Sequence, residues 1–466
     1  MTDSIAVSGP QLMVGLVLAI VVLIFLVLRT RIHALLALVT AASIAGLVGG
    51  MAPDALVKTI TSGFGSTLST IGLVIGFGVM MGRLLEVSGA GERMAYSIIA
   101  WLGAKREEWA MAITGYIVSI PVFCDSAFVI LNPLARALVR NSGKSVLTLG
   151  IALAGGLMLS HHAIPPTPGP LGIAGIFGVD IGLMMFWGMV FTVPSLFVLI
   201  AYARIMGPRI ERMMQHDVEV DPRETYEAVM SRARERDAEL PPLWLSVLPI
   251  VLPIVLIFAN TLIGVLARYG DGAIAQSLLG QVLTFLGNPV IAVGLGVVAA
   301  IYGLVPRMPR EQLIGEMEKG VESAGIILLV TGAGGALGAV LRESGGGQYM
   351  GELVASLPMP AVLIPFVIAT LVRLIQGSGT VAMITAASIS MPILSTIADV
   401  NMVFAALAAA IGSMVFGYFN DSFFWVVNRM LGVRQAKHQI LTWSVPTTLC
   451  WFTSLVTLLL FNALLG

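Results

Sequence analysis

Long apolar runs separated by short polar segments dominate the chain. They extend over residues 11–28, 35–51, 183–203, 243–266 and 442–465. A helix that crosses the hydrocarbon core of a bilayer needs roughly 20 residues, and it satisfies its own backbone hydrogen bonds there. The pattern therefore predicts an all-α polytopic membrane protein with roughly 10–14 membrane segments.

One charged stretch interrupts this pattern and divides the chain. Residues 204–239 carry seven arginines and nine acidic residues. Such a run is usually a solvated face without a chemical role, so it predicts a cytoplasmic linker over residues 204–242. The linker would separate a first transmembrane half, residues 1–203, from a second half, residues 243–466.

The two halves contain a repeated segment. GRLLEVSGAGERM at residues 82–94 aligns without a gap with GAVLRESGGGQYM at residues 338–350, and DSAFV from Asp125 lies near the counterpart of GSGTV from Gly377. Shared composition of glycine-rich membrane helices is the alternative explanation. Two repeated halves favour a transporter with alternating access, in which substrate binds at the repeat interface.

The first break in the apolar pattern is SIPVFCDSAFVILNP at residues 119–133. Irregular backbone at membrane depth is tolerated only where it is buried in protein or lines a cavity. Asp125 and Ser126 lie inside this break, and intramembrane acids usually mark an ion path. We therefore expect Asp125 to bind the coupling ion and Ser126 to contact substrate; in the alternative interpretation, Asp125 only caps a helix near the interface.

The second break is SHHAIPPTPGPLG at residues 160–172, in which four prolines fall within six residues. Proline removes a backbone donor, so this segment cannot be helical through its centre. Thr167 offers a hydroxyl suited to a polyol, and His162 is a second candidate contact. His161 and His162 could also ligate a metal, but adjacent side chains splay apart and no further ligand motif accompanies them, so no metal is predicted.

The third break is LVRLIQGSGTVAMITAAS at residues 371–388. The guanidinium of Arg373 matches a carboxylate bidentately, and no acid lies near it in sequence, so an anionic substrate is its expected partner. In the alternative interpretation, Arg373 reaches the interface or pairs with distant Asp421. The helix that follows offers N–H groups to an anion. The remaining candidate contacts here are Gln376, Ser378, Gly379 and Thr380.

A late acidic motif, YFNDSFFW at residues 418–425, lies between two apolar runs. Asn420 is a candidate substrate contact, and Asp421 is the second candidate for proton or cation coupling. If the halves superpose, Asp421 corresponds roughly to the proline-rich second break. Both motifs would then meet at one site.

Composition and charge exclude several classes of function. The chain is 57% hydrophobic and 11% charged, against about 25% charged in soluble domains. Lysine plus arginine number 26 and balance 26 acidic residues, so no basic surface indicates a nucleic-acid partner. Cys124 and Cys450 lie far apart, which favours neither a disulfide nor a metal site, and no cofactor is predicted.

Positive charges predict the orientation in the membrane. The first apolar run lacks a basic start and a cleavage site, so it is expected to be a transmembrane helix and not a signal peptide. Cytoplasmic loops hold the excess of lysine and arginine, which places the N-terminus outside. The expected cytoplasmic groups are Arg29 with Arg31, Arg136 with Arg140 and Lys144, and Arg209 with Arg212.

The motifs together resemble the gluconate permease family, the proton-linked sugar-acid transporters of bacteria. IPVFCDSAFVILNPL, HHAIPPTPGPL, RLIQGSGTVAMITAAS, YFNDSFFW and LTWSV occur in the family's order across both halves. The resemblance implies a two-repeat fold with a scaffold and a transport domain, re-entrant hairpins, an elevator-like movement and homodimers. It also implies an inner-membrane location.

The sequence departs from the family pattern at three places. DSA at residues 125–127 replaces glutamate, valine and glycine, YF at residues 418–419 precedes NDSFFW where the family has HVNDSGFW, and Gly379 replaces a common alanine. The anion-handling parts are kept while their surroundings differ. The substrate class, a small hydroxy-carboxylate, is therefore better defined than the individual acid.

These observations lead to one functional hypothesis and three alternatives. Arg373 and the GSGT helix start would hold the carboxylate, Thr167 would contact hydroxyls, and Asp125 or Asp421 would carry a coupling proton. A sodium-coupled carrier is the first alternative, because unwound carbonyls and hydroxyls also coordinate sodium. A channel and an integral-membrane metalloenzyme are weaker alternatives, the latter because no HExxH motif is present.

Overall fold

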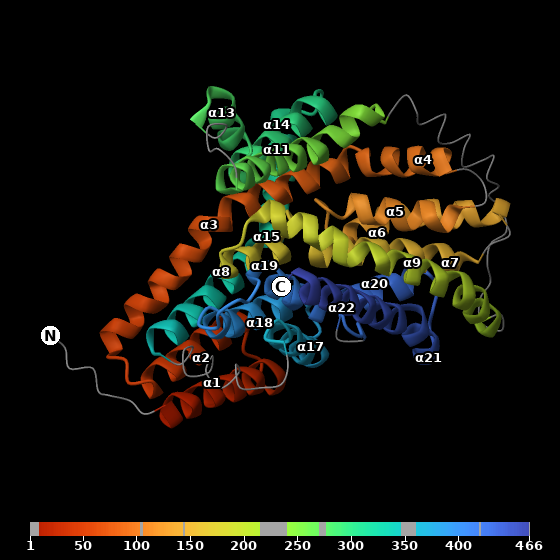
Figure 1. The fold of residues 1–466 in the computed structure, drawn as a ribbon. Coiled ribbons are helices and arrows are strands. Elements are labelled where there is room, and N and C mark those ends of the chain that lie inside the picture. Colours follow the sequence, from red (N-terminus) through yellow and green to blue (C-terminus); the bar gives the residue numbers. More distant parts are fainter. Residues whose placement is uncertain are drawn as a thin grey trace.

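The computed structural model describes residues 9–102, 106–142, 145–214, 240–269, 276–345, 360–418 and 421–465. Every regular element within these ranges is a helix, so the predicted all-α class is confirmed (Figure 1). Asn420, most of the predicted linker and the end of the second repeat segment lie outside the described residues.

The helices form two series of similar order. The first series is α1 (Gly9–Arg29), α2 (Ala34–Val48), α3 (Pro53–Val87), α4 (Ala90–Leu102), α5 (Glu107–Val118), α6 (Cys124–Ser142), α7 (Val146–Ala163), α8 (Pro168–Phe177) and α9 (Ile181–Met214). The second is α11 (Leu243–Tyr269), α13 (Leu278–Leu286), α14 (Pro289–Leu304), α15 (Arg310–Glu343), α17 (Leu363–Gln376), α18 (Gly379–Leu394), α19 (Met402–Gly412), α20 (Ser422–Met430), α21 (Ala436–Gln439), the π-helix η2 (Ile440–Ser444) and α22 (Val445–Leu465). In each series a long helix precedes two helix–break–helix units and a final long helix.

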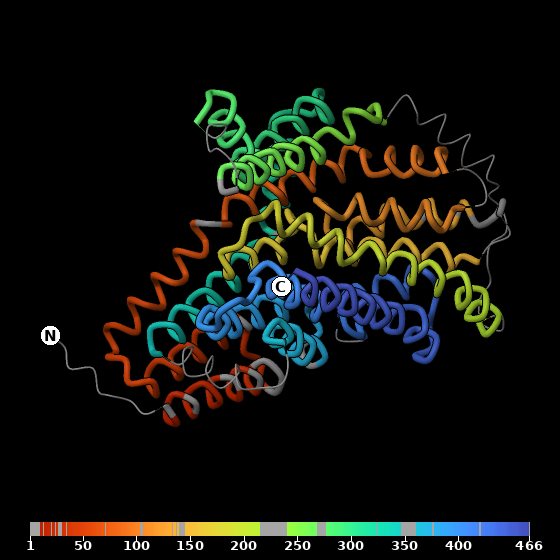
Figure 2. Tube along the Cα trace, viewed as in Figure 1, coloured from red at the N-terminus to blue at the C-terminus, as the bar shows by residue number. Residues whose placement is uncertain are grey.

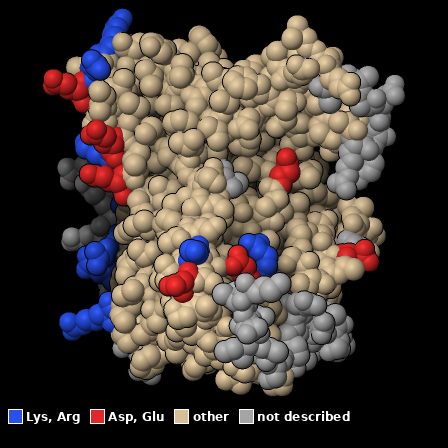
Figure 3. Space-filling model, turned by 90° about the vertical axis from the view of Figure 1, so that its left-hand side faces the viewer, with Lys and Arg blue, Asp and Glu red and all other residues tan. Residues whose placement is uncertain are grey.

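The lengths and composition of the helices suit a membrane. Five described helices are long and apolar enough to span it, or up to seven if each of two bent pairs counts as one span. The five apolar runs predicted from the sequence fall on α1, α2, α9, α11 and η2 with α22. The face drawn in Figure 3 is largely uncharged, with most charged side chains along one edge. The structure therefore agrees with a multi-pass membrane protein.

The repeated sequence segment has a common local structure. α3 ends at a C-cap, Ser88, and α15 ends at Ser344, and in each case the next residue is a glycine with a left-handed backbone. Gly89 has φ +75° and Gly345 has φ +78°, values that L side chains rarely adopt. The SG pair thus ends two equivalent helices.

The predicted boundary at residue 203 falls inside α9, which continues to Met214.

α3 and α15 cross at very short range, and the crossing depends on glycine. A Cβ on Gly335 would overlap Thr67 Oγ1 and come within 2.9 Å of the Gly63 carbonyl oxygen. Backbones approach this closely in membranes only where side chains are small.

We expect Gly335→Ala to lower the stability of the folded protein by about 1–3 kcal/mol, the usual cost of overpacking. The matched control is Gly325→Ala on the same helix, where a Cβ would meet nothing within 4 Å. Both changes raise helix propensity equally. Thermal unfolding in detergent would measure the difference, and equal midpoints for the two variants would contradict the tight crossing.

Candidate functional site

Four breaks interrupt the paired helices. They lie at residues 119–123, 164–167, 377–378 and 413–421. In Figure 2 the second-half helices α17 to α22 lie against the first-half helices α5 to α9, and packing of α8 on α18 and of α6 on α20 agrees with this view. All four breaks are thereby brought to the same region of the molecule.

Two of the breaks are the starts of neighbouring half-helices. A Cβ on Gly169, in the first turn of α8, would lie 2.9 Å from Met383 Sδ and 3.6 Å from Thr380 Cγ2 of α18. One turn later, Gly172 faces Ile384 at 3.3 Å, so the two helices run parallel from adjacent N-termini. The first N–H groups of a helix have no intrahelical acceptor, and its N-terminal end carries partial positive charge. The paired ends form a region suited to an anion.

Arg373 and Asp421 form a buried ion pair beside these helix ends. Arg373 Nη2 donates to Asp421 Oδ2 at 2.7 Å, and the two side chains are only 5% and 10% exposed. Arg373 Nη1 donates to the carbonyl oxygen of Gly377. Arg373 Nε has no hydrogen-bond partner among the described residues. The sequence left three partners open for Arg373: an anionic substrate, the membrane interface and Asp421. In the described conformation Arg373 pairs with Asp421.

The position of the Asp421 carboxylate is fixed by its own helix. Asp421 Oδ1 accepts a hydrogen bond from the backbone N–H of Phe423 at 3.1 Å and caps α20. The preceding break is held by η2 and α22, because Ser444 Oγ donates to the Gly417 carbonyl oxygen at 2.6 Å and Gly417 N donates to Thr447 Oγ1 at 3.1 Å. These two bonds tie Gly417 to η2 and α22.

Asp125 belongs to the same region. It is in the first turn of α6, and it is close enough to Asp421 for the two carboxylates to interact electrostatically. Asp125 Oδ1 is buried and has no hydrogen-bond partner among the described residues. Ser126 follows it and is half-buried. Two acids therefore share the region, one paired with arginine and one unpaired at Oδ1.

His162, rather than His161, faces the GSGT segment. His162 Nδ1 lies 3.0 Å from the Met158 carbonyl oxygen, and its Nε2 points at Gly379. A ring that donates through Nδ1 keeps Nε2 as an acceptor. His161 packs instead beside Phe123, with ring centroids 5.8 Å apart.

Two of the other predicted contacts, Thr167 and Ser378, make hydrogen bonds within their own segments. Thr167 Oγ1 donates to the Ile164 carbonyl oxygen at 2.7 Å, and so the hydroxyl proton holds the second break together. Ser378 caps α18 by accepting from Val381 N at 3.4 Å. Gln376 ends α17, and nothing is described of its side chain. Thr380 follows Gly379 in the first turn of α18.

Gly379 is the residue that lets His162 approach α18. A Cβ there would overlap His162 Nε2 and lie 3.0 Å from Cδ2 of the same ring. We expect Gly379→Ala to displace the ring and reduce uptake at least tenfold, because a displacement of about 1 Å in a binding site can cost 100-fold. Radiolabelled uptake into vesicles would measure the loss.

Two further variants separate steric displacement from a general loss of folding. Gly76→Ala, on α3 with nothing within 4 Å of the added Cβ, is expected to transport like the wild type. The double variant Gly379→Ala/His162→Ala removes the overlap, so it should fold and insert normally. Wild-type uptake by Gly379→Ala alone would show that the His162 contact is unimportant.

Sequence reasoning did not single out two residues beside the ion pair. Gly417 and Trp443 both face Arg373 and Asp421, since a Cβ on Gly417 would meet Trp443 Nε1, Asp421 Oδ2 and Arg373 Nη2. Trp443 lies in the LTWSV segment, which counted only as part of the family resemblance. A buried tryptophan in an apolar run has no distinguishing pattern in sequence.

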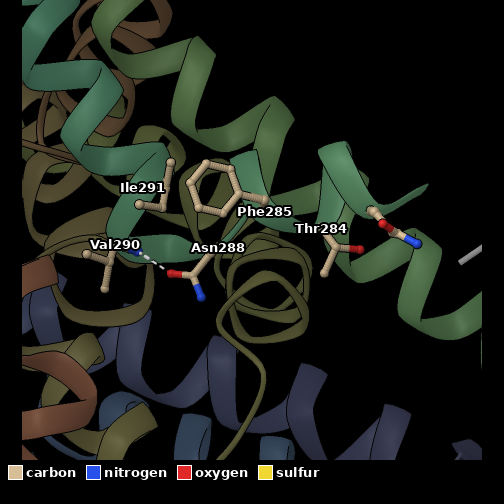
Figure 4. Close-up of a pocket in the computed structure, with 6 residues that line it drawn as sticks. Thr284, Phe285, Asn288, Val290 and Ile291 are labelled. Carbon is tan, nitrogen blue, oxygen red and sulfur yellow. Dashed lines mark hydrogen bonds between the residues drawn. The ribbon is translucent and has the colours of Figure 1, made fainter. Parts of the chain in front are cut away.

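A separate hollow lies at the elbow between α13 and α14 (Figure 4). This open hollow has a volume of about 580 Å³, and in its lining Asn288 Oδ1 accepts a hydrogen bond from Val290 N at 3.0 Å. Its lining contains no charged side chain and no residue of the four breaks. A carboxylate would find no partner there, so the breaks remain the better candidate site. The lining residues are Gln281, Thr284, Phe285, Asn288, Val290 and Ile291.

Comparisons with known proteins agree with this architecture. A family model described as GntP family permease matches residues 11–464. An uncharacterized permease of Haemophilus influenzae is 54% identical, covering 98% of this chain and 93% of the relative, and a gluconate permease of Pseudomonas aeruginosa is 30% identical, covering 97% and 98%. The YdaH transporter of Alcanivorax borkumensis has a similar fold, with a TM-score of 0.61 at 16% identity, covering 97% of this chain and 99% of that one.

Proposed function

The chain belongs to the GntP permease family, and from this premise we propose that it imports gluconate or a related small hydroxy-carboxylate by proton symport. Membership makes it a multi-pass inner-membrane transport protein and not an enzyme. The Pseudomonas aeruginosa relative is a gluconate permease, which supports a sugar acid as the substrate.

The observation that carries the proposal is the half-occupied fork of Arg373. A carboxylate bound side-on to a guanidinium uses Nε and Nη2 together. Asp421 occupies Nη2, whereas Nε has no partner among the described residues. Because Nη2 already donates to Asp421, a substrate carboxylate bound side-on would lie directly against the Asp421 carboxylate. In our proposal the substrate displaces Asp421, and the two anions compete for one arginine.

This competition supplies a reason for proton coupling. A proton on Asp421 removes its charge and releases Arg373 to the substrate. With neither anion present, the buried arginine would be uncompensated, and with both present an extra negative charge would be buried; either state is costly. Substrate anion and proton therefore enter the site together. Asp125, within electrostatic range of Asp421, would be a second position for the proton.

The rest of the substrate would lie along the paired helix starts. Backbone N–H groups of the first turns of α8 and α18 can donate to hydroxyl and carboxylate oxygens. His162 Nε2 can accept from a hydroxyl. The other predicted contacts stay predictions: Ser126, Thr167, Gln376, Ser378, Thr380 and Asn420.

Sodium coupling is the competing proposal, because broken helices also offer carbonyl oxygens to a cation. Counterflow in proteoliposomes preloaded with a panel of hydroxy acids tests the substrate class. Labelled gluconate should accumulate transiently when unlabelled sugar acids are inside, with or without sodium. Absence of counterflow with every acid, in protein shown to be folded, would contradict the carboxylate assignment.

A further inference from the structure

Trp443 is the largest side chain of the region and has no assigned role. It is 1% exposed, and its indole Nε1 has no hydrogen-bond partner among the described residues. Buried tryptophan N–H groups usually find an acceptor, because an unpaired donor in an apolar interior is costly. The unpaired N–H therefore calls for an explanation.

The backbone around Trp443 fixes where the indole points. Trp443 lies on η2, and π-helical turns are rare and occur frequently at functional sites. The ring packs edge-on against Phe423, with centroids 4.9 Å apart. The next residue, Ser444, donates to the Gly417 carbonyl oxygen, which ties η2 to the fourth break.

Gly417 shows what the indole faces. A Cβ built on Gly417 would lie 2.7 Å from Trp443 Nε1, 2.9 Å from Asp421 Oδ2 and 3.2 Å from Arg373 Nη2. The three polar atoms thus converge on the open side of one glycine. Two of them already form the ion pair, and the third is the unpaired donor.

We propose that the Trp443 N–H is a further substrate-binding group, which donates to the carboxylate that Arg373 receives. This inference rests on the proposed function. The indole nitrogen donates and cannot accept, so it favours an anionic oxygen over a hydroxyl proton or an amine. Arg373 Nε, Arg373 Nη2 and Trp443 Nε1 would then surround the carboxylate with three donors. Gly417 is small because any Cβ would fill the space that these groups share.

Trp443→Phe tests the proposal, since phenylalanine keeps an aromatic ring and removes the donor. We expect the gluconate concentration for half-maximal uptake to rise about tenfold, the usual effect of losing a hydrogen bond to a charged group, with little change in maximal rate. The matched control is Trp451→Phe, whose indole donates to Thr370 Oγ1 at 3.0 Å. The control should leave half-saturation unchanged.

A spectroscopic measurement covers the case in which Trp443→Phe fails to insert. In a variant that keeps Trp443 as the only one of the seven tryptophans, gluconate is expected to shift the indole emission, and mannitol is not. No shift at saturating gluconate, or a Trp443→Phe variant whose half-saturation is unchanged while the wild type transports, would overturn the role of Trp443. If the wild type itself transports no hydroxy acid, the proposed function fails instead.

Discussion

Arg373→Ala is expected to reduce gluconate uptake to about 1% of the wild-type rate or less, because truncating one partner of a buried, hydrogen-bonded charge pair costs about 2–5 kcal/mol or more. The change removes the guanidinium that would hold the carboxylate side-on, and it leaves Asp421 buried without its arginine. Arg373→Lys keeps the charge but loses the fork, so it should also transport poorly. Radiolabelled uptake, normalised to the amount of inserted protein, measures both variants.

Folding and binding can be separated for Arg373. The double variant Arg373→Ala/Asp421→Asn removes both buried charges, and we expect it to insert normally and still not transport. Arg209→Ala, at an exposed position on α9, controls for loss of any arginine and should retain full uptake. Normal uptake by the Arg373→Ala variant would remove the carboxylate-binding role.

Asp421→Asn is expected to separate substrate exchange from proton-driven accumulation. Asparagine caps a helix about as well as aspartate, so α20 should keep its start. It cannot take up a proton, and it leaves Arg373 permanently available to substrate. Counterflow should therefore persist, whereas accumulation driven by an imposed pH gradient should fall at least tenfold, the effect of losing about 1.4 kcal/mol of coupling.

The matched control for Asp421→Asn is Asp399→Asn. Asp399 is exposed and has φ +61°, a backbone conformation that asparagine also tolerates. We expect this control to accumulate substrate like the wild type. If Asp421→Asn accumulates gluconate as fully as the control does, the coupling proton is carried elsewhere, and Asp125 becomes the next residue to test.

Local signals in the sequence predicted much of the architecture. Apolar runs of sufficient length predicted α1, α2, α9, α11 and α22, and the prolines of residues 160–172 predicted the break between α7 and α8. Both signals act over a few residues, through hydrophobic length and the missing N–H of proline. The SG repeat likewise reflects a local requirement, a left-handed residue after α3 and after α15.

Pairings between distant segments could not be predicted in the same way. Arg373 and Asp421 are 48 residues apart, and their contact depends on how α17 packs against the fourth break. The orientation of His162 toward Gly379 depends on where the end of α7 meets the start of α18. Trp443 lies in a π-helical turn. Such a turn changes the helical period over only a few residues, and in an apolar sequence this leaves no visible pattern. Only the assembled helices bring these groups together.

The most direct test of the central claim is a simultaneous measurement of proton and gluconate entry into proteoliposomes in a weakly buffered, sodium-free medium. The competition for Arg373 predicts that the external pH rises when gluconate is added, with about one proton entering per gluconate, because a buried arginine is compensated by one anion at a time. Gluconate entry without a change in external pH, or entry only when sodium is supplied, would contradict proton symport through Asp421.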